Sequence, residues 1–139
     1  GHYNNPEIIN KEHLDEIHEL IQPVVFDCCD FVVSFIFVEP NDFVYLDPPY
    51  VSASCANACT SFVGYTATGF TMDNHTHLFA LIHQLTETNK KMMMSNADVQ
   101  LVRDNFSSSV YHISSLLCKR AIHSKHPEAK AKEVIIKNY

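Results

Sequence analysis

Four consecutive residues, Asp47-Pro48-Pro49-Tyr50, combine groups that suit chemistry on a flat, weakly nucleophilic amine. They follow an apolar run at residues 43–46, which predicts that they lie at the end of a buried strand. Open α/β sheets bind their ligands at the carboxyl ends of their strands. The sequence therefore predicts a carboxylate, a stiff turn and an aromatic ring at a place where a substrate can bind.

Each of these groups can help an amine whose lone pair is delocalised into a ring, such as the exocyclic amine of adenine. The carboxylate of Asp47 can accept one amine hydrogen and the carbonyl of Pro48 the other, which stabilises the tetrahedral, positively charged nitrogen that develops during attack. The two proline rings aim that carbonyl before the substrate arrives. The ring of Tyr50 offers a surface on which a base can stack, worth ~1–3 kcal/mol. A plainer interpretation is a structural turn, in which Pro-Pro and a capping Asp are common.

The spacing of apolar residues predicts an α/β fold in which helices and strands alternate. Most of the sheet is expected to be parallel, and the last two strands, which have no helix between them, are expected to pair antiparallel. The expected elements are a helix at 11–22, a strand at 24–28, a short helix opening at Asp30, a strand at 43–46, a long loop at 51–70, a helix capped by Thr71 or Asp73, a strand at 91–95, a helix at 98–106, and strands at 111–118 and 133–139.

The charge of the chain is unevenly distributed. The net charge is −6, but residues 119–139 alone carry +4, so the other residues carry −10. A local basic stretch in an acidic chain is a candidate contact for nucleic-acid phosphates. A solvated loop whose lysines keep the protein soluble is the alternative.

Composition indicates one domain without a membrane span or a signal peptide. The five cysteines are odd in number and are expected to be reduced thiols in an intracellular protein, in the cytoplasm of a bacterium or of a virus-infected cell. Cys55 and Cys59 lack a second pair at zinc-finger spacing, so no metal site is expected. The histidines on the predicted helix, His75, His77 and His83, do not share one face and are expected at the surface.

Taken together, these motifs resemble the Dam-like class of DNA adenine-N(6) methyltransferases. The tetrad with its preceding strand resembles the catalytic strand and loop of the family, and the order of the other motifs along nearly the whole chain is similar. The matching segments are Phe43 to Tyr50, Phe62-Val63-Gly64-Tyr65 with Gly69-Phe70, Met94-Ser95-Asn96-Ala97-Asp98, Lys119-Arg120-Ala121-Ile122, and Val134 to Tyr139.

The resemblance implies a class I methyltransferase (Rossmann-like) fold and S-adenosylmethionine as the methyl donor. It implies that Asp47 and Pro48 bind the amine and that Tyr50 stacks a flipped-out base. Asp30 would lie near the adenosine of the donor, together with Asp47, although an N-cap role for Asp30 is equally consistent with the sequence.

The resemblance also implies residues that contact double-stranded DNA. Phe62 and Tyr65 would help to close the pocket around the base, unless they merely anchor a loop. Lys119, Arg120 and Lys125 would contact phosphates, although Lys119 stands where the family has Arg and cannot make the same bidentate contact. A second difference from the family lies directly after Lys119-Arg120-Ala121-Ile122, where the family has Asn and this chain has His123.

One part of the family pattern is absent from these residues. The family begins with a strand and a glycine-rich loop that cradles the amino-acid end of the donor, and the three glycines here form no such loop. We therefore expect residues 1–139 to be the carboxyl-terminal portion of a single methyltransferase catalytic domain. The amino-terminal strands and most of the target-recognition segment would belong to a missing amino-terminal portion of the same protein.

The function expected from these residues is site-specific methylation of adenine in DNA, as in restriction–modification. The fragment alone is expected to be inactive, because its sheet would have a gap. Two alternatives stay open. One is methylation of another planar amine, such as cytosine, an RNA base or a glutamine amide. The other is a catalytically inactive remnant that only mediates an interaction.

Overall fold

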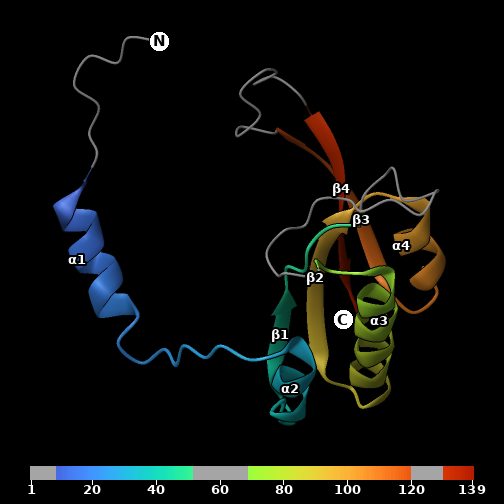
Figure 1. The fold of residues 1–139 in the computed structure, drawn as a ribbon, viewed down its shortest axis with the longest axis horizontal. Coiled ribbons are helices and arrows are strands. Elements are labelled where there is room, and N and C mark those ends of the chain that lie inside the picture. The colour runs from blue at the N-terminus through green and yellow to red at the C-terminus, as the bar shows by residue number, and fades with distance from the viewer. Residues whose placement is uncertain (1–8, 52–68, 120–129) are drawn as a thin grey trace.

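The computed structural model describes residues 9–51, 69–119 and 130–139, which form four helices and four strands (Figure 1). Most of the predicted elements are confirmed, with shifts of a few residues at their ends. The described elements are α1 (Lys11–Leu20), α2 (Phe31–Ile36), β1 (Phe43–Leu46), α3 (Met72–Glu87), β2 (Lys91–Ala97), α4 (Gln100–Asn105), β3 (His112–Lys119) and β4 (Lys130–Lys137).

The four strands form one open, mixed sheet in the order β1-β2-β4-β3. β1 and β2 run parallel, with Leu46 opposite Met94. β4 lies antiparallel to both β2 and β3, which confirms the predicted closing pair. Since β1 and β2 are parallel and in register, the residues that follow them emerge at the same edge of the sheet.

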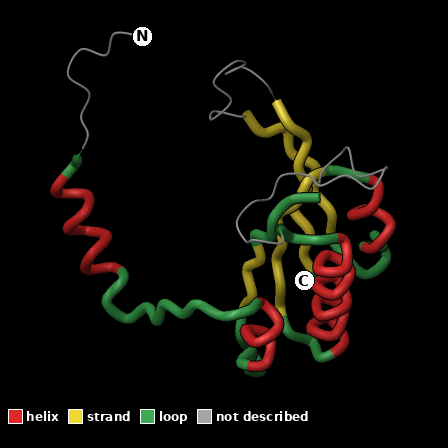
Figure 2. The backbone as a smooth tube through the Cα atoms, viewed as in Figure 1, coloured by secondary structure: helices red, strands yellow, loops and turns green. Residues whose placement is uncertain are grey.

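The core lies between this sheet and α3. α3 contacts β2, and α2 packs against α3 beside β1 (Figures 1 and 2). Alternate residues of β2 and β4 face inward, as a strand period of two requires. The fully buried apolar side chains come from α3, β2, α4 and its following turn, and β4: Phe79, Ile82, Met92, Met94, Val102, Phe106, Val134 and Ile136.

Two helix starts agree with the sequence prediction. Thr71 caps α3 and forms a capping box with Asn74, in which each side chain bonds the backbone N–H of the other residue. Asp30 caps α2, and its carboxylate accepts a hydrogen bond from the backbone N–H of Val32 at 2.9 Å. These caps fix where α2 and α3 begin, next to the carboxyl end of β1.

The strand predicted at residues 24–28 is wrong, because this segment has no regular secondary structure and pairs with no described strand. Val25 is 90% exposed and Phe26 is 76% exposed. A strand needs a neighbour for its backbone N–H and C=O groups, and without one the apolar pattern alone does not make a strand. One of the three described strand pairings is consequently parallel and two are antiparallel.

The surface placement expected for the histidines is wrong for His75, which is only 3% exposed. It lies on the inner face of α3 between Phe70 and Phe79, and burial lowers its pKa below the ordinary value. His75 shares this face with Leu78, Phe79 and Ile82, at the i, i+3, i+4, i+7 spacing of a buried helix face. That spacing was available in the sequence.

Candidate active site

Asp47 is the first residue after β1, and its carboxylate is held by β2. The hydroxyl of Ser95 donates a hydrogen bond to Oδ1 of Asp47, with the two oxygens 2.5 Å apart. The contact follows from the parallel register, because Asp47 comes directly after Leu46 and Ser95 directly after its partner Met94. The carboxylate is thus placed at the edge of the sheet where the sequence predicted it.

The other end of the tetrad is held by the next residue of β2. Oδ1 of Asn96 accepts hydrogen bonds from the backbone N–H of Val51 at 3.1 Å and of Ala97 at 2.8 Å. Asn96 is fully buried, and its Nδ2 has no partner in the part of the chain that the structure describes. Ser95 and Asn96 therefore bracket Asp47-Pro48-Pro49-Tyr50 from two sides.

Tyr50 reaches across the sheet edge toward β4. Its hydroxyl donates to Oε2 of Glu133 at 3.4 Å, a long hydrogen bond. Burial raises the pKa of the Tyr50 hydroxyl, a hydrogen bond with Ser95 lowers it, and the charges of Glu133 and Asp47 raise it further. A tyrosine hydroxyl is protonated at neutral pH even without this upward shift, so the ring is presented as a neutral phenol.

A cavity of about 280 Å³ lies beside Asp47, between β1, α2 and α3. Its walls are mainly apolar, and the carboxylate of Asp47 stands among them. Phe31 and Phe70 lie on one side, with ring centres 5.6 Å apart and planes tilted by 56°. The lining residues are Phe31, Tyr45, Leu46, Asp47, Pro48, Pro49, Phe70 and Leu78. Aromatic and aliphatic walls with one carboxylate are suited to a flat heterocycle that carries hydrogen-bond donors.

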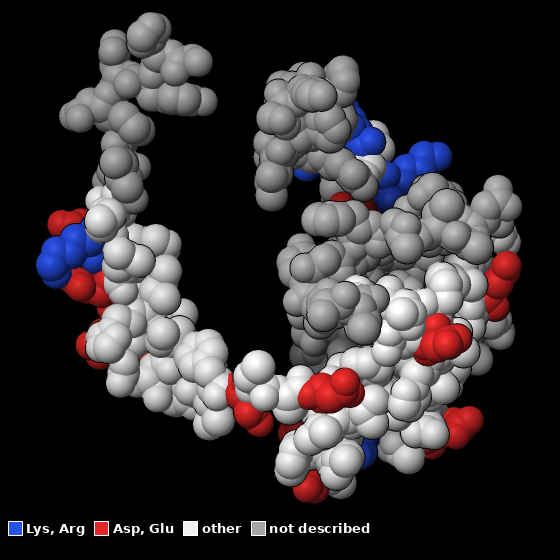
Figure 3. All heavy atoms as spheres, in the orientation of Figure 1, with Lys and Arg blue, Asp and Glu red and all other residues white. Residues whose placement is uncertain are grey.

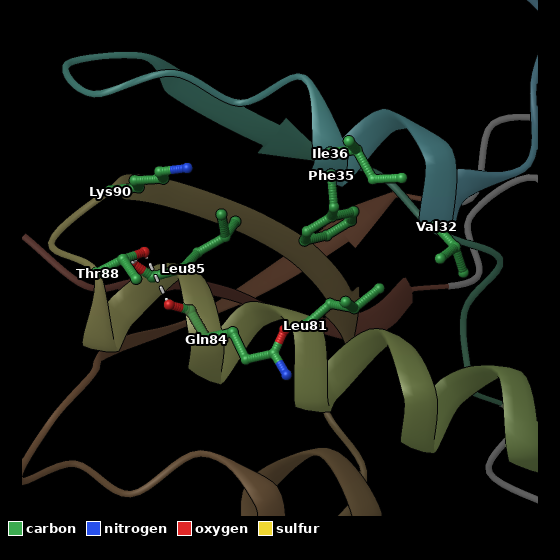
Figure 4. Close-up of a pocket in the computed structure, with 8 residues that line it drawn as sticks. All are labelled: Val32, Phe35, Ile36, Leu81, Gln84, Leu85, Thr88 and Lys90. Carbon is green, nitrogen blue, oxygen red and sulfur yellow. Dashed lines mark hydrogen bonds between the residues drawn. The ribbon is translucent and has the colours of Figure 1, made fainter.

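A second cavity, of about 270 Å³, lies between α2 and α3 and extends toward Lys90, just before β2 (Figure 4). Phe35, Leu81 and Leu85 supply apolar walls. The amine of Lys90 donates to the backbone carbonyl of Val38, and so its charge is used to tie two loops together. This cavity lies toward the amino end of β2, away from Asp47, and we assign no chemistry to it.

The other predicted site residues differ in how far the structure describes them. Asp30 serves as the cap of α2 and directly precedes Phe31, a wall of the first cavity; a contact of Asp30 with a donor stays a prediction. Pro48 and Pro49 line that cavity. Phe62, Tyr65, Arg120 and Lys125 lie outside the described residues, as do Cys55 and Cys59.

Lys119 lies at the end of β3, opposite Lys130 at the start of β4. Lys119, Lys130 and Lys132 are all exposed at this end of the β3–β4 hairpin, and Figure 3 shows Lys and Arg side chains gathered there. Acidic side chains dominate the lower part of the same view. On this face of the molecule, the basic end of the hairpin therefore lies apart from the acidic side chains.

The sequence interpretation assigned no role to Ser95, Asn96 or Glu133. The sequence partly marks Ser95 and Asn96, because they directly follow an apolar run of methionines. Polar residues at the end of a buried strand are unusual. Their contacts with the tetrad depend on which strands are neighbours and in which register. None of that is readable from the spacing of residues.

Comparison with known proteins agrees with this geometry. Residues 1–122 match the family model of the D12 class N6 adenine-specific DNA methyltransferases. The type II methyltransferase M.MjaIII of Methanocaldococcus jannaschii is 31% identical over 144 residues, covering 100% of this chain and 47% of that protein. The retron Ec67 DNA adenine methylase of Escherichia coli is 29% identical, covering 98% of this chain and 44% of its own length.

The DNA adenine methylase of Escherichia coli K12 is 27% identical, again over 100% of this chain and 48% of its own length. The chain thus spans about half the length of the curated relatives that it matches. None of the described helices has the length and apolar character that a membrane crossing needs. The matched family model, the order of the motifs and the carboxylate at the end of β1 agree, and the chain belongs to the D12 class N6 adenine-specific DNA methyltransferases.

Proposed function

We propose that this chain supplies the catalytic loop, Asp47-Pro48-Pro49-Tyr50, for methyl transfer to the exocyclic N6 amine of adenine in double-stranded DNA. The observation that carries the proposal is the placement of Asp47, whose carboxylate is held at the end of β1 beside an apolar cavity. Family membership supports the reaction class, since a D12 methyltransferase is named for N6 of adenine.

In this proposal Asp47 and Pro48 hold the reacting amine. A carboxylate has about four lone-pair sites, so the bond from Ser95 leaves capacity to accept an amine hydrogen. The carbonyl of Pro48 accepts the second hydrogen. Both acceptors are fixed before the substrate binds and stabilise the positive charge that develops on the nitrogen.

The cavity beside Asp47 fits the proposed donor, S-adenosylmethionine, which supplies a methyl group attached to a sulfonium. Phe31 and Phe70 can hold a planar purine. The carboxylate of Asp47 lines the same cavity and would favour the positive charge of a sulfonium bound there. Asp30, directly before Phe31, caps α2. Its carboxylate would also accept a hydrogen bond from a hydroxyl group of the adenosine part of the donor. The residues present therefore fit one part of the donor.

Tyr50 would stack the extruded adenine through its ring, while its hydroxyl makes a long hydrogen bond to Glu133. Phe62 and Tyr65 would help to close the pocket. Lys119, at the basic end of the β3–β4 hairpin, would contact DNA phosphates together with Arg120 and Lys125. The roles of Phe62 and Tyr65 rest on the family pattern. The phosphate contacts rest on the basic charge of residues 119–139 and, for Lys119, on its place in the hairpin.

The proposed reaction needs more than these residues. The chain corresponds to about half of its relatives, and we propose that residues 1–139 form the carboxyl-terminal portion of one catalytic domain. An amino-terminal portion of the same protein would complete the donor site and recognise the DNA sequence. Since the proposed substrate is genomic DNA, the protein would act inside a cell.

The test compares the 139-residue chain with the complete protein that contains it. Calorimetry measures S-adenosylmethionine binding, and a radiolabelled donor measures transfer to duplex DNA, single-stranded RNA and a glutamine peptide. We expect the complete protein to bind donor and to label adenine in duplex DNA, and the chain alone to do neither. Labelling of cytosine, RNA or glutamine would replace adenine as the substrate, and a complete protein that binds no donor would favour an inactive remnant.

A further inference from the structure

Two buried polar residues at the carboxyl end of β2, Ser95 and Asn96, contact opposite ends of the catalytic loop. We propose that they are positioning residues that clamp the loop and fix the direction of the Asp47 carboxylate. This deepens the function proposed above and rests on it. Neither side chain is assigned to contact substrate or donor.

Ser95 acts on the carboxylate itself. Asp47 is exposed at the end of a strand, where its side chain has several staggered rotamers available. The short hydrogen bond from the Ser95 hydroxyl selects one of them. The same hydroxyl lies 3.5 Å from the carbonyl of Leu46 and also interacts with the hydroxyl of Tyr50, and its single proton goes to the closest, charged partner, Asp47.

Asn96 acts on the backbone at the other end. Its Oδ1 accepts two backbone N–H groups, one from Val51 directly after the tetrad and one from Ala97 in its own strand. An aliphatic residue would leave both donors unpaired in a buried place, and an Asp would bury a charge there. The neutral amide therefore suits this position, and its bond to Val51 connects the loop to the sheet.

The proposed chemistry requires the fixed placement of Asp47 and Pro48 that the clamp provides. Two acceptors can hold one amine only if Asp47 and Pro48 keep a fixed relation to each other. Ser95 holds the side chain of Asp47, and Asn96 holds the backbone three residues beyond Pro48. A misplacement of about 1 Å in such a pair can cost about 100-fold in rate.

The first test measures the kinetics of the complete protein with Ser95→Ala. A hydrogen bond to a charged group contributes about 1.5–3 kcal/mol, so we expect kcat to fall about 10- to 100-fold. Donor affinity and KM for DNA should stay within about twofold, and Ser95→Thr, which keeps the hydroxyl, should recover most of the rate. Ser115→Ala is the matched control, because the hydroxyl of Ser115 bonds the carboxylate of Asp98 rather than that of Asp47.

The second test needs no methyl transfer. Hydrogen exchange at the Val51 amide should quicken at least about tenfold in Asn96→Ala and stay unchanged in Asn138→Ala, whose Oδ1 accepts from Met92 at the other end of β2. Unchanged exchange at Val51 would overturn the clamp. If Asn96→Ala does not fold, the Ser95 variants decide the proposal.

The results distinguish a failure of the proposed function from a failure of the clamp alone. A complete wild-type protein that transfers no methyl group would overturn the proposed function and the clamp with it. An active wild type whose kcat is unchanged in Ser95→Ala would overturn the clamp alone. The same holds if Ser95→Thr is as slow as Ser95→Ala while its thermal unfolding midpoint is that of the wild type.

Discussion

Tyr50 and Glu133 are joined by a hydrogen bond from the tyrosine hydroxyl to the carboxylate at 3.4 Å, across 83 residues of sequence. The bond links the loop that follows β1, which holds Asp47 and Tyr50, to β4. A hydrogen bond of this length is weak. The ring of Tyr50, rather than its hydroxyl, is therefore expected to contribute most to binding a base.

Tyr50→Phe is accordingly expected to be milder than Tyr50→Ala. Phe keeps the stacking surface and loses only the bond to Glu133, so kcat/KM should fall less than about fivefold, a loss of under ~1 kcal/mol. Ala loses the stacking, worth ~1–3 kcal/mol. Steady-state methylation of duplex DNA by the complete protein measures both. Equal losses would mean that the hydroxyl has a chemical role of its own.

Asp47→Ala is expected to abolish methyl transfer in the complete protein while donor binding survives at a reduced level. In the proposed function the carboxylate would accept a hydrogen of the amine, whereas it is only one wall of the cavity proposed for the donor. Calorimetry with S-adenosylmethionine and a single-turnover transfer assay separate the two effects. Near-normal methylation by Asp47→Ala would remove Asp47 from the catalytic role.

Met94→Ala is expected to lower the free energy of unfolding by about 2–5 kcal/mol, the usual cost of truncating a buried methionine. Met94 is fully buried in β2, next to Ser95. Met93→Ala is the matched control, because Met93 points to the other face of the same strand and is only half-buried. Met93→Ala should lower the free energy of unfolding by about 1 kcal/mol or less. Urea unfolding of the three proteins tests the assigned register of β2.

The ion pair between Arg103 and Asp98 should make stability depend on pH. Arg103 donates to both carboxylate oxygens, at 2.5 Å and 2.9 Å, and holds the pKa of Asp98 below its ordinary value. The pair therefore stabilises the fold above the unfolded-state pKa of Asp98, and this contribution disappears as the pH falls through the lower folded-state pKa.

Arg103→Gln should consequently be less stable than the wild type near pH 7, with the difference vanishing in acid. Urea midpoints measured from neutral to acidic pH give the comparison. Lys11→Gln is the control, because its partner Asp15 is exposed on α1 and such surface pairs contribute little. A difference that persists unchanged below the folded-state pKa of Asp98 would contradict the assignment.

The sequence predicts those parts of this molecule that local patterns determine. The apolar run before Asp47 indicates β1, and Thr71 with Asn74 three residues later marks the start of α3. The segment at 24–28 has an equally good strand pattern and forms no strand, because pairing depends on a neighbour. The bond between Ser95 and Asp47 likewise depends on the parallel register of β1 and β2, which no short-range pattern encodes.

The last prediction concerns the basic end of the β3–β4 hairpin, where Lys119 pairs in register with Lys130. If Lys119, Arg120 and Lys125 bind DNA phosphates, replacing any one of them by Ala should weaken binding to all DNA sequences alike. The slope of log affinity against log salt should become shallower by about 1 for each phosphate that is no longer neutralised. Arg120 should matter most, because only a guanidinium binds a phosphate through two parallel hydrogen bonds.

Donor affinity should not change in these variants, because the described residues that line the cavity beside Asp47 come from β1, α2, α3 and the loops next to them, and not from β3 or β4. Lys91→Ala is a suitable control, since Lys91 is exposed at the opposite end of the sheet, at the start of β2. Fluorescence anisotropy with duplex DNA at several salt concentrations measures the slopes. Slopes equal to the wild type in all three variants would show that these charges only solvate the loop, because a protein that neutralises fewer phosphates must release fewer counterions when it binds DNA.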